Sequence, residues 1–315
     1  MSEAEPRVYT KEERRDIMNR MQAGDMTVSN KEVADAFSID ASADPKDIPL
    51  DQMNPAHPSL FKHDTFWGHF ECLRKEDPVH FTEESVFGPY WSITRYEDIM
   101  HVDKNHEIFS SKQSLGGITL NGVKGRDDEF ALPMFIQDDP PKHDAQRKVV
   151  APMFTPKNLQ DLEPLIRERA GDILDNLPRG EEINLVREVS VELTGQMLAT
   201  LFDVPQEDRM KLVHWSDTVA SLGDPDAFDS PEEGFQILFE CLAYFQEYYE
   251  ARKKEPPAFN LVSMLAHDEA TSEMGPQELL GNIILLIVGG NDTTRNSISG
   301  GVLALNRNPD QYEKL

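Results

Sequence analysis

Residues 285–297, LLIVGGNDTTRNS, combine side chains that can move a proton with glycines that leave space beside them. Gly289 and Gly290 follow an apolar run, and Asp292 and Thr293 come almost directly after them. In a helix, each glycine costs about 1 kcal/mol relative to alanine, and Asn, Asp and Thr are also mediocre helix formers. A helix with this sequence therefore needs an offsetting use for the space or for the polar groups.

Helical spacing arranges these residues around one spot. Leu285, Gly289 and Thr293 form a row at i, i+4 and i+8, and Val288 and Asp292 lie beside it. The Thr293 hydroxyl can donate to the Gly289 carbonyl, which bends or widens a helix locally. The pattern predicts a dry apolar pocket with a hydroxyl and a carboxylate, suited to general acid catalysis, at one corner.

Close helix packing is the simpler explanation of such glycines, because a glycine lets a neighbouring backbone approach. We expect Gly300 and Gly301, further along the same segment, to serve only this purpose. For the first glycine pair, the neighbouring carboxylate and hydroxyls favour the pocket.

A second candidate lies in residues 138–156, DDPPKHDAQRKVVAPMFTP. Asp139 is predicted to cap a helix opened by two prolines, with His143 and Arg147 on one face at i and i+4. Such a pair is typical of a solvated surface in a chain with 28% charged residues. The planar guanidinium of Arg147 can also bind a carboxylate through two hydrogen bonds.

The elements that position these groups belong to an acidic chain of 315 residues. A formal net charge of -26 and a pI near 4.6 argue against nucleic acid as a partner, because phosphate binding needs clustered Lys and Arg. With 39% hydrophobic residues, the chain can build a substantial core. Small molecules and proteins remain as partners.

Cysteine usage and the N-terminal sequence bear on the compartment. Cys72 and Cys241 are the two cysteines, which indicates neither a disulfide framework nor a Cys-rich metal site. The N-terminus is charged where a signal peptide needs an apolar stretch, and no segment reaches the roughly 18 apolar residues of a membrane span. We therefore expect a cytoplasmic protein without a membrane span.

Hydrophobic periodicity predicts a mainly α-helical chain with a small β-sheet region on its N-terminal side. Residues 1–50 are charged and weakly periodic, so we expect a polar N-terminal extension with one amphipathic helix around 11–21. Strand-like runs at 79–85 and 90–96 flank a Phe-Gly-Pro break and predict a hairpin.

Residues 112–138 are rich in glycine and charge, and a loop of that length in a compact domain is usually functional. Thr155 and Pro156 supply an N-cap and a first-turn proline for a helix that follows. Helices are predicted over 157–177, 188–202, 232–254, 259–270 and 276–306.

Two motifs resemble one family. Residues 289–294, GGNDTT, are similar to the (Ala/Gly)-Gly-x-(Asp/Glu)-Thr pattern in the central helix of cytochromes P450, the haem-thiolate monooxygenases. Residues 138–156 match the Asp-Pro-Pro-x-His-x-x-x-Arg and Phe-Thr-Pro patterns of the same family in register. The resemblance covers residues 55–315 in the right order. Within the family, the sequences of residues 116–120, 132–148 and 285–306 are most similar to those of soluble bacterial alkane and fatty-acid terminal hydroxylases.

The resemblance implies the cytochrome P450 fold, with residues 51–315 as the N-terminal two-thirds of a single domain through the oxygen-binding helix. It implies haem b as cofactor and O2 as co-substrate, with the haem propionates clamped by His143 and Arg147. Dioxygen would bind beside Gly289, Gly290 and Thr294. Thr293 would hydrogen-bond it, and Asp292 would relay protons.

The implied reaction inserts one oxygen atom into a terminal C–H bond of a medium-chain alkane or fatty acid. Electrons would come from NAD(P)H through a reductase and a 2Fe-2S ferredoxin, which could dock near Lys142 and Lys148. The candidate contacts of the apolar substrate are Leu285, Val288, Ile118, Leu120 and Ile136.

Two further signatures of the family are absent from the sequence. These are a Glu-x-x-Arg pair in a later helix and the glycine-rich loop whose cysteine ligates the iron. Cys72 and Cys241 lack such surroundings and are interpreted as small hydrophobes on helix faces. We therefore expect a C-terminally truncated fragment, inactive by itself, whose axial cysteine would lie beyond residue 315.

A different class also accommodates these patterns: a non-catalytic helical protein with an apolar small-molecule pocket, in which the glycines serve packing only. It predicts no haem and no turnover. A carboxylate-bridged di-iron bundle is excluded, because the sequence contains no pair of Glu-x-x-His motifs.

Overall fold

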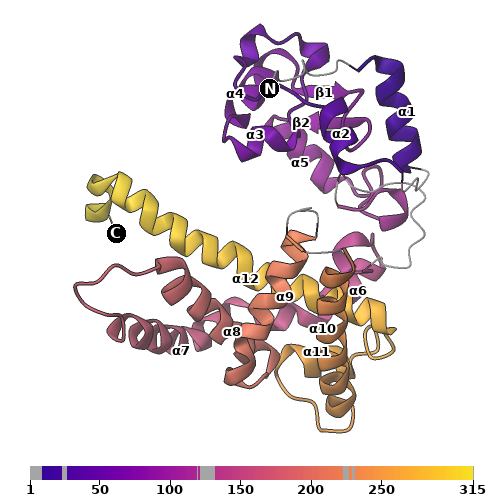
Figure 1. The fold of residues 1–315 in the computed structure, drawn as a ribbon. Coiled ribbons are helices and arrows are strands. Elements are labelled where there is room, and N and C mark those ends of the chain that lie inside the picture. Colours follow the sequence, from indigo (N-terminus) through magenta and orange to yellow (C-terminus); the bar gives the residue numbers. More distant parts are fainter. Residues whose placement is uncertain are drawn as a thin grey trace. The chain divides into compact units, whose positions relative to one another are not determined.

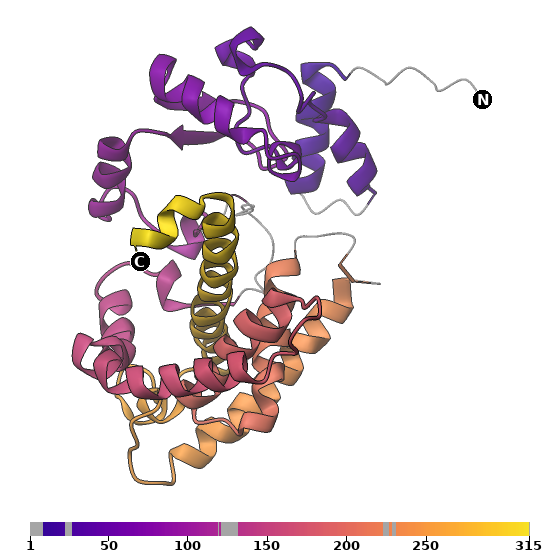
Figure 2. The ribbon, with the colours of Figure 1, turned by 90° about the vertical axis from the view of Figure 1, so that its left-hand side faces the viewer.

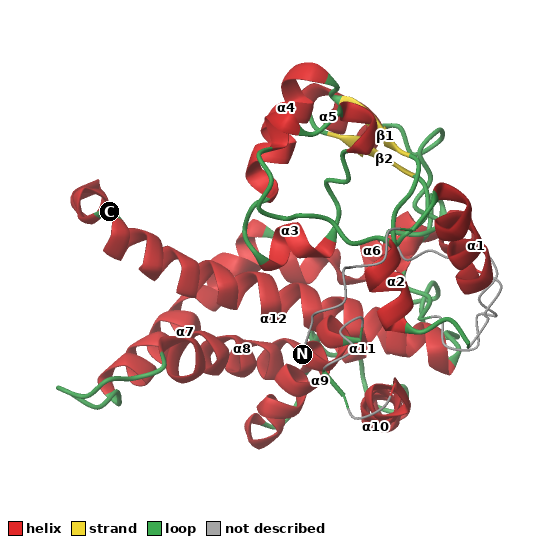
Figure 3. Cartoon of the chain, turned by 45° about the horizontal axis from the view of Figure 1, so that its top comes forward, coloured by secondary structure: helices red, strands yellow, loops and turns green. Residues whose placement is uncertain are grey.

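The computed structural model describes residues 9–22, 27–118, 120, 132–222, 227–228 and 231–314. The chain divides into two compact units: an N-terminal unit, Met1–Phe130 with Gln137–Asp139, and a C-terminal unit, Ala131–Ile136 with Pro140–Leu315. Helices dominate both units, and the strands within the described ranges form one hairpin (Figure 1, Figure 3). The predicted mainly helical class with a small sheet is confirmed.

The hairpin belongs to the N-terminal unit. β1, Val79–Thr82, pairs antiparallel with β2, Tyr90–Ile93. Gly88 in the connection has a φ of 82°, a left-handed conformation that glycine adopts without a steric penalty. The predicted hairpin is therefore confirmed. The helices of this unit are α1 (Lys11–Gln22), α2 (Asn30–Ala36), α3 (Pro58–Lys62), α4 (Phe66–Glu76) and α5 (Tyr96–Lys104).

The N-terminal segment, predicted as a polar extension, contains two helices that share a few buried apolar residues. α1 confirms the helix predicted around residues 11–21, but its Ile17 is buried together with Ala36 and Phe37 of the α2 region. Ser29 caps α2 by accepting a hydrogen bond from the Glu32 N–H at 3.1 Å. Three apolar side chains on facing helix surfaces are enough to give this charged segment a small core of its own.

The C-terminal unit is built from helices. α7 begins at Pro156, and the Thr155 hydroxyl accepts from the Asn158 N–H at 3.4 Å, which confirms the predicted cap. A π-helical turn, Val186–Val191, leads into α8. The other helices are α6 (Lys142–Val150), α9 (Arg209–Ser221), α10 (Pro231–Arg252), α11 (Leu261–His267) and α12 (Pro276–Arg307), and α7 and α8 span Pro156–Asp175 and Glu192–Phe202.

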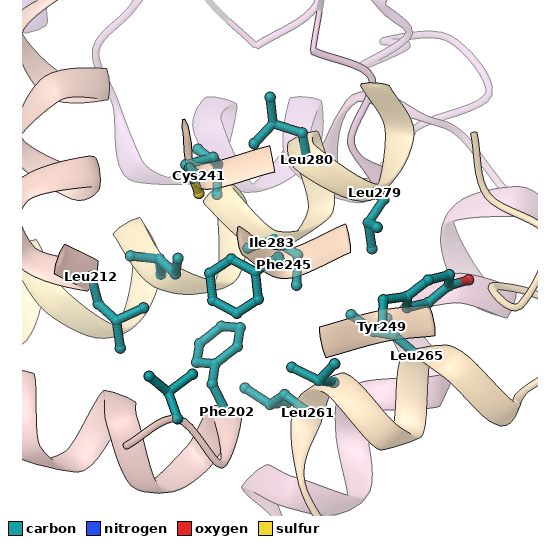
Figure 4. Close-up of a cluster of buried hydrophobic side chains, with 14 of the residues drawn as sticks. Phe202, Leu212, Cys241, Phe245, Tyr249, Leu261, Leu265, Leu279, Leu280 and Ile283 are labelled. Atoms are coloured by element: carbon teal, nitrogen blue, oxygen red, sulfur yellow. The ribbon is translucent and has the colours of Figure 1, made fainter. Parts of the chain in front are cut away.

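The core of the C-terminal unit lies where α8, α9, α10, α11 and the first half of α12 meet (Figure 4). The rings of Phe202 and Phe245 lie edge to face with centroids 5.5 Å apart, and Ile283 lies beside them. Cys241 is fully buried in this cluster, and burial raises the pKa of its thiol. This burial confirms the interpretation of Cys241 as a small hydrophobe.

α12 carries the residues that opened the sequence analysis. It begins at Pro276, where the missing N–H of proline costs no helix hydrogen bond, and continues without interruption to Arg307. Its first half is buried, and Asn291 is the last buried residue along it. Figure 2 shows the yellow second half extending beyond the packed helices of its unit. No helix in the described ranges has the length and apolar character needed to cross a membrane.

Candidate active site on the central helix

Gly289 and Thr293 form the core of the candidate site. Among the described residues, a Cβ atom built on Gly289 would meet no atom within 4 Å outside its own helix turn, so space is open there. One turn later, the exposed Thr293 donates from Oγ1 to the Gly289 carbonyl at 3.0 Å. The predicted back-bond is confirmed, and it occurs inside a continuous α-helix without a widened turn.

The second glycine of the pair has a different role. A Cβ atom on Gly290 would lie 2.9 Å from Cδ2 of Leu198, so the absence of a side chain lets α12 approach α8. Gly300 and Gly301 were expected to serve packing only, but a Cβ at either would meet nothing within 4 Å among the described residues. That expectation is wrong here, because both face open space instead of a neighbouring backbone.

Asp292, the carboxylate of the candidate site, is partly exposed and paired. Its Oδ1 accepts from Arg295 Nη2 at 2.9 Å, and Arg295 Nη1 lies 2.7 Å from Oδ1 of Asp217 on α9. Burial lowers the pKa of Arg295, but the hydrogen bonds and charges of the two carboxylates outweigh it and raise that pKa overall. Thr294 is exposed next to this group.

α6 places His143 and Arg147 one turn apart, as predicted. His143 Nδ1 lies 2.8 Å from Asp144 Oδ1, and the side chain of His143 is 28% exposed. Arg147 is exposed, and its guanidinium has no hydrogen-bond or ion-pair partner among the residues the structure describes. A free cation beside an imidazole suits a bound carboxylate, as the haem propionates would require.

The predicted cap of this helix is wrong. α6 begins only at Lys142, and no side chain caps it. The Asp139 carboxylate instead accepts from the Ser110 hydroxyl at 2.6 Å and from the Ser111 N–H at 3.1 Å, and these bonds keep the pKa of Asp139 below its usual value. The Asp139 carboxylate is therefore occupied by the Ser110 hydroxyl and the Ser111 N–H and does not cap α6.

A polar cluster that the sequence analysis missed joins α6 to α12. Oε1 of Glu278 accepts from Gln146 Nε2 at 2.8 Å and lies 2.9 Å from Lys142 Nζ. Burial is the largest influence on the pKa of Glu278 and raises it, but the bonds from these two partners outweigh burial, so the pKa is lowered overall. The charge of Lys142, which was predicted to attract a ferredoxin, is thus partly neutralised by Glu278.

Two adjacent residues of α12, Gly281 and Asn282, contact the segment that precedes α6. Asn282, fully buried, accepts from the Phe135 N–H at 2.9 Å. A Cβ atom on Gly281 would lie 2.0 Å from the Pro133 carbonyl oxygen, so only glycine fits. A single polar Asn inside the apolar run 279–288 was the sequence signal for this contact.

The predicted substrate contacts are spread over the two units. Leu285 and Val288 are partly buried against the core of the C-terminal unit, to which Ile136, 39% exposed, also belongs. Ile118 and Leu120 belong to the N-terminal unit and are 48% and 44% exposed. Their role in substrate binding stays a prediction.

The described residues fit one part of a haem site. The space at Gly289 and the free guanidinium of Arg147 suit the oxygen side and the propionates. Neither cysteine suits the iron, since Cys241 is buried in the core and Cys72 lies on α4 of the other unit. No cluster of three His, Cys, Asp or Glu side chains in the described ranges could hold a metal ion.

Comparison with known proteins identifies the family. Linalool 8-monooxygenase of Pseudomonas putida is 32% identical over 265 residues, which cover 82% of this chain and 65% of that protein. The methyl-branched lipid omega-hydroxylase of Mycobacterium tuberculosis is 31% identical over 257 residues, 78% of this chain and 59% of that protein. No family model matches the chain.

Among solved structures, cytochrome P450-153 from Novosphingobium aromaticivorans is similar with a TM-score of 0.75 and 41% identity, over 83% of this chain and 65% of that one. The chain thus spans 59% to 65% of the length of these relatives. Together with the Gly-Gly-x-Asp-Thr helix and the His–Arg face of α6, these similarities establish that the chain belongs to the cytochrome P450 family.

Proposed function

We propose that this chain supplies the oxygen-side wall and the propionate clamp of a haem-dependent monooxygenase that hydroxylates the terminal C–H bond of medium-chain alkanes or fatty acids. The open space at Gly289, next to the Thr293 hydroxyl, is the observation that carries the proposal. Ordinary packing does not require it, because the neighbouring Gly290 already serves the contact with α8.

Arg147 and His143 would hold haem b through its propionates. When bound, the haem supplies the iron that reduces and cleaves dioxygen, with electrons that derive from NAD(P)H. The guanidinium of Arg147 offers two parallel donors to a carboxylate, and its lack of a protein partner in the described ranges leaves both available.

Thr293 and Asp292 would move protons toward the oxygen. The Thr293 hydroxyl donates to its own helix in the structure, and a change of χ1 to another staggered rotamer, about 120° away, would redirect it to a ligand above Gly289. Asp292 is partly exposed and can exchange protons with solvent. A hydroxyl in contact with the oxygen and a carboxylate behind it form a two-member relay. Thr294 and Gly290 would border the same space.

The substrate would be an apolar chain. Leu285 and Val288 lie on the same side of α12 as the open space, and we assign them to the substrate channel together with Ile118, Leu120 and Ile136. The names of the relatives support this class, since one is an omega-hydroxylase of methyl-branched lipids and another a linalool 8-monooxygenase.

A 2Fe-2S ferredoxin and its reductase are the proposed electron donors. Lys148 on α6 is exposed and offers positive charge beside Arg147, whereas Lys142 is partly neutralised by Glu278. We therefore place more of the docking charge on Lys148 than on Lys142. A rate of reduction by ferredoxin that does not change with ionic strength would contradict this docking surface.

The test is product analysis of the haem-loaded monooxygenase that contains this chain together with an axial cysteine, with NAD(P)H, ferredoxin and reductase, on alkanes and fatty acids of graded length. Thr293→Ala should divert reducing equivalents from product to hydrogen peroxide. Ser297→Ala is the matched control, because Ser297 makes the same back-bond, to the Thr293 carbonyl at 2.8 Å, one turn away. Absence of haem binding and of any product would favour the non-catalytic pocket protein instead.

A further inference from the structure

A polar row runs along α12 on the side opposite Gly289 and Thr293. Ile283 and Ile287, fully buried, are followed at the same four-residue spacing by Asn291, Arg295 and Ser299. This row lies two residues, about 200°, around the helix from the row of the candidate site. The face of α12 that packs inward thus changes from apolar to polar at the site.

Each member of the polar row bonds to a neighbouring helix. Asn291 accepts from Thr194 of α8 at 3.0 Å, and Ser299 lies 2.7 Å from Ser190 of the π-helical turn, oxygen to oxygen. Arg295 pairs with Asp217 of α9. Hydrogen bonds are directional where apolar contacts are not, so the two hydrogen bonds, together with the ion pair to Asp217, fix the rotation of α12 about its axis.

Arg295 differs from the other two because it reaches both rows. One guanidinium nitrogen, Nη1, forms an ion pair with Asp217, and the other, Nη2, donates a hydrogen bond to Asp292 at the edge of the site. The side chain of Arg295 is 16% exposed, against 47% for Asp217 and 36% for Asp292. The rigid planar fork of arginine therefore holds the more exposed carboxylate of Asp292 at a fixed place.

We propose that Arg295 is a positioning residue with two separable roles: Nη2 holds the Asp292 carboxylate where it can pass protons to Thr293, and Nη1 joins α9 to α12 through Asp217. The first role rests on the proposed function of Asp292. The second is a matter of helix packing alone.

Four variants separate the two roles. Arg295→Gln removes both links, and Asp217→Asn removes only the link to α9. The double exchange Asp217→Arg with Arg295→Asp restores the link to α9 but leaves Asp292 without a cation. Glu192→Gln is the matched control, because Glu192 pairs with Arg209 of α9 at 3.0 Å and has no contact with the site among the described residues.

Three measurements apply to each variant. Amide hydrogen exchange over residues 209–221 reports the attachment of α9, and carbodiimide labelling of Asp292, read by peptide mass, reports how freely that carboxylate moves without needing haem. The share of NAD(P)H electrons recovered as product, with KM and kcat, reports proton delivery in the haem-loaded monooxygenase that contains this chain together with an axial cysteine.

Arg295→Gln should raise Asp292 labelling and lower kcat about tenfold each, the change expected for losing one hydrogen bond to a charged group, with KM nearly constant. The double exchange should behave likewise for labelling and kcat while its α9 exchange stays at the wild-type rate. Asp217→Asn and Glu192→Gln should speed α9 exchange but leave labelling and kcat within about twofold.

Labelling and kcat that follow α9 exchange across all variants would overturn the proposal, since Arg295 would then act through packing alone. Unchanged Asp292 labelling in Arg295→Gln would overturn it as well. A wild-type protein that labels as expected but forms no product would refute the proposed function while leaving the hold of Arg295 on Asp292 supported.

Discussion

Replacing Gly289 with alanine should stabilise the protein and at the same time close the space that the proposed function needs. A mid-helix Gly→Ala exchange gains about 1 kcal/mol from helix propensity. Within the part of the chain that the structure describes, the new Cβ would meet no atom within 4 Å outside its own helix turn, so no packing cost opposes the gain. The expected net stabilisation is about 1 kcal/mol, or roughly fivefold in the folding equilibrium constant.

Gly290→Ala is the matched control, one residue along the same helix. The propensity gain is the same, but the new Cβ would lie 2.9 Å from Cδ2 of Leu198, which is only 2% exposed. Overpacking of a filled core costs about 1 to 3 kcal/mol, so the exchange should be neutral or destabilise by up to about 2 kcal/mol. Gly289→Ala should therefore stabilise the protein, whereas Gly290→Ala should not.

Urea unfolding measures both variants, and an unchanged m-value would show that the exchange altered stability without altering compactness. In the haem-loaded protein, carbon monoxide binding to the reduced iron should weaken in Gly289→Ala, because the methyl group occupies the open space. Destabilisation by Gly289→Ala, or equal stabilisation by both variants, would refute the assignment of one glycine to the site and the other to packing.

Three further outcomes follow from the buried polar groups and the cysteines. Asn282→Leu should destabilise by about 1 to 3 kcal/mol in urea unfolding, because the buried Phe135 N–H loses its acceptor. The folded-state pKa of Glu278 is lowered, so its stabilising effect is present at neutral pH and is lost as the pH falls below the ordinary range of a glutamate carboxyl toward the folded value. Glu278→Gln should flatten stability over that acid range in a pH series of unfolding curves. An aromatic disulfide reagent should modify the partly exposed Cys72 in the native protein and leave Cys241 unmodified until unfolding, and equal rates would contradict the burial of Cys241.

Local patterns were enough to predict the elements that carry the site. The hairpin, the cap at Thr155 and the start of α12 each depend on a few consecutive residues, and the Thr293 back-bond depends only on helical spacing. Those features are encoded within one or two turns of chain, which is the range over which propensity and periodicity act.

Features that depend on distant residues were not predictable from the sequence. Asp139 looked like a helix cap, but Ser110, 29 residues earlier, competes for its carboxylate. α9 was missed because its apolar residues are interrupted by charged ones and no cap marks its start. Arg295 could be placed on α12 from its spacing, yet nothing local reveals that Asp217 would share its guanidinium.

The contact between Gly281 of α12 and Pro133 also bears on the order in which parts of the protein fold during synthesis. The adjoining hydrogen bond between Phe135 and Asn282 joins residues 147 positions apart. At roughly 5 to 20 residues per second, a ribosome needs about 7 to 30 s to make the intervening chain. Throughout that interval the emerging segment 132–137 lacks the helix that covers it. A nascent chain of this protein therefore exposes apolar surface for seconds, and chaperone occupancy on ribosomes stalled before residue 276 should exceed that on ribosomes stalled well after it.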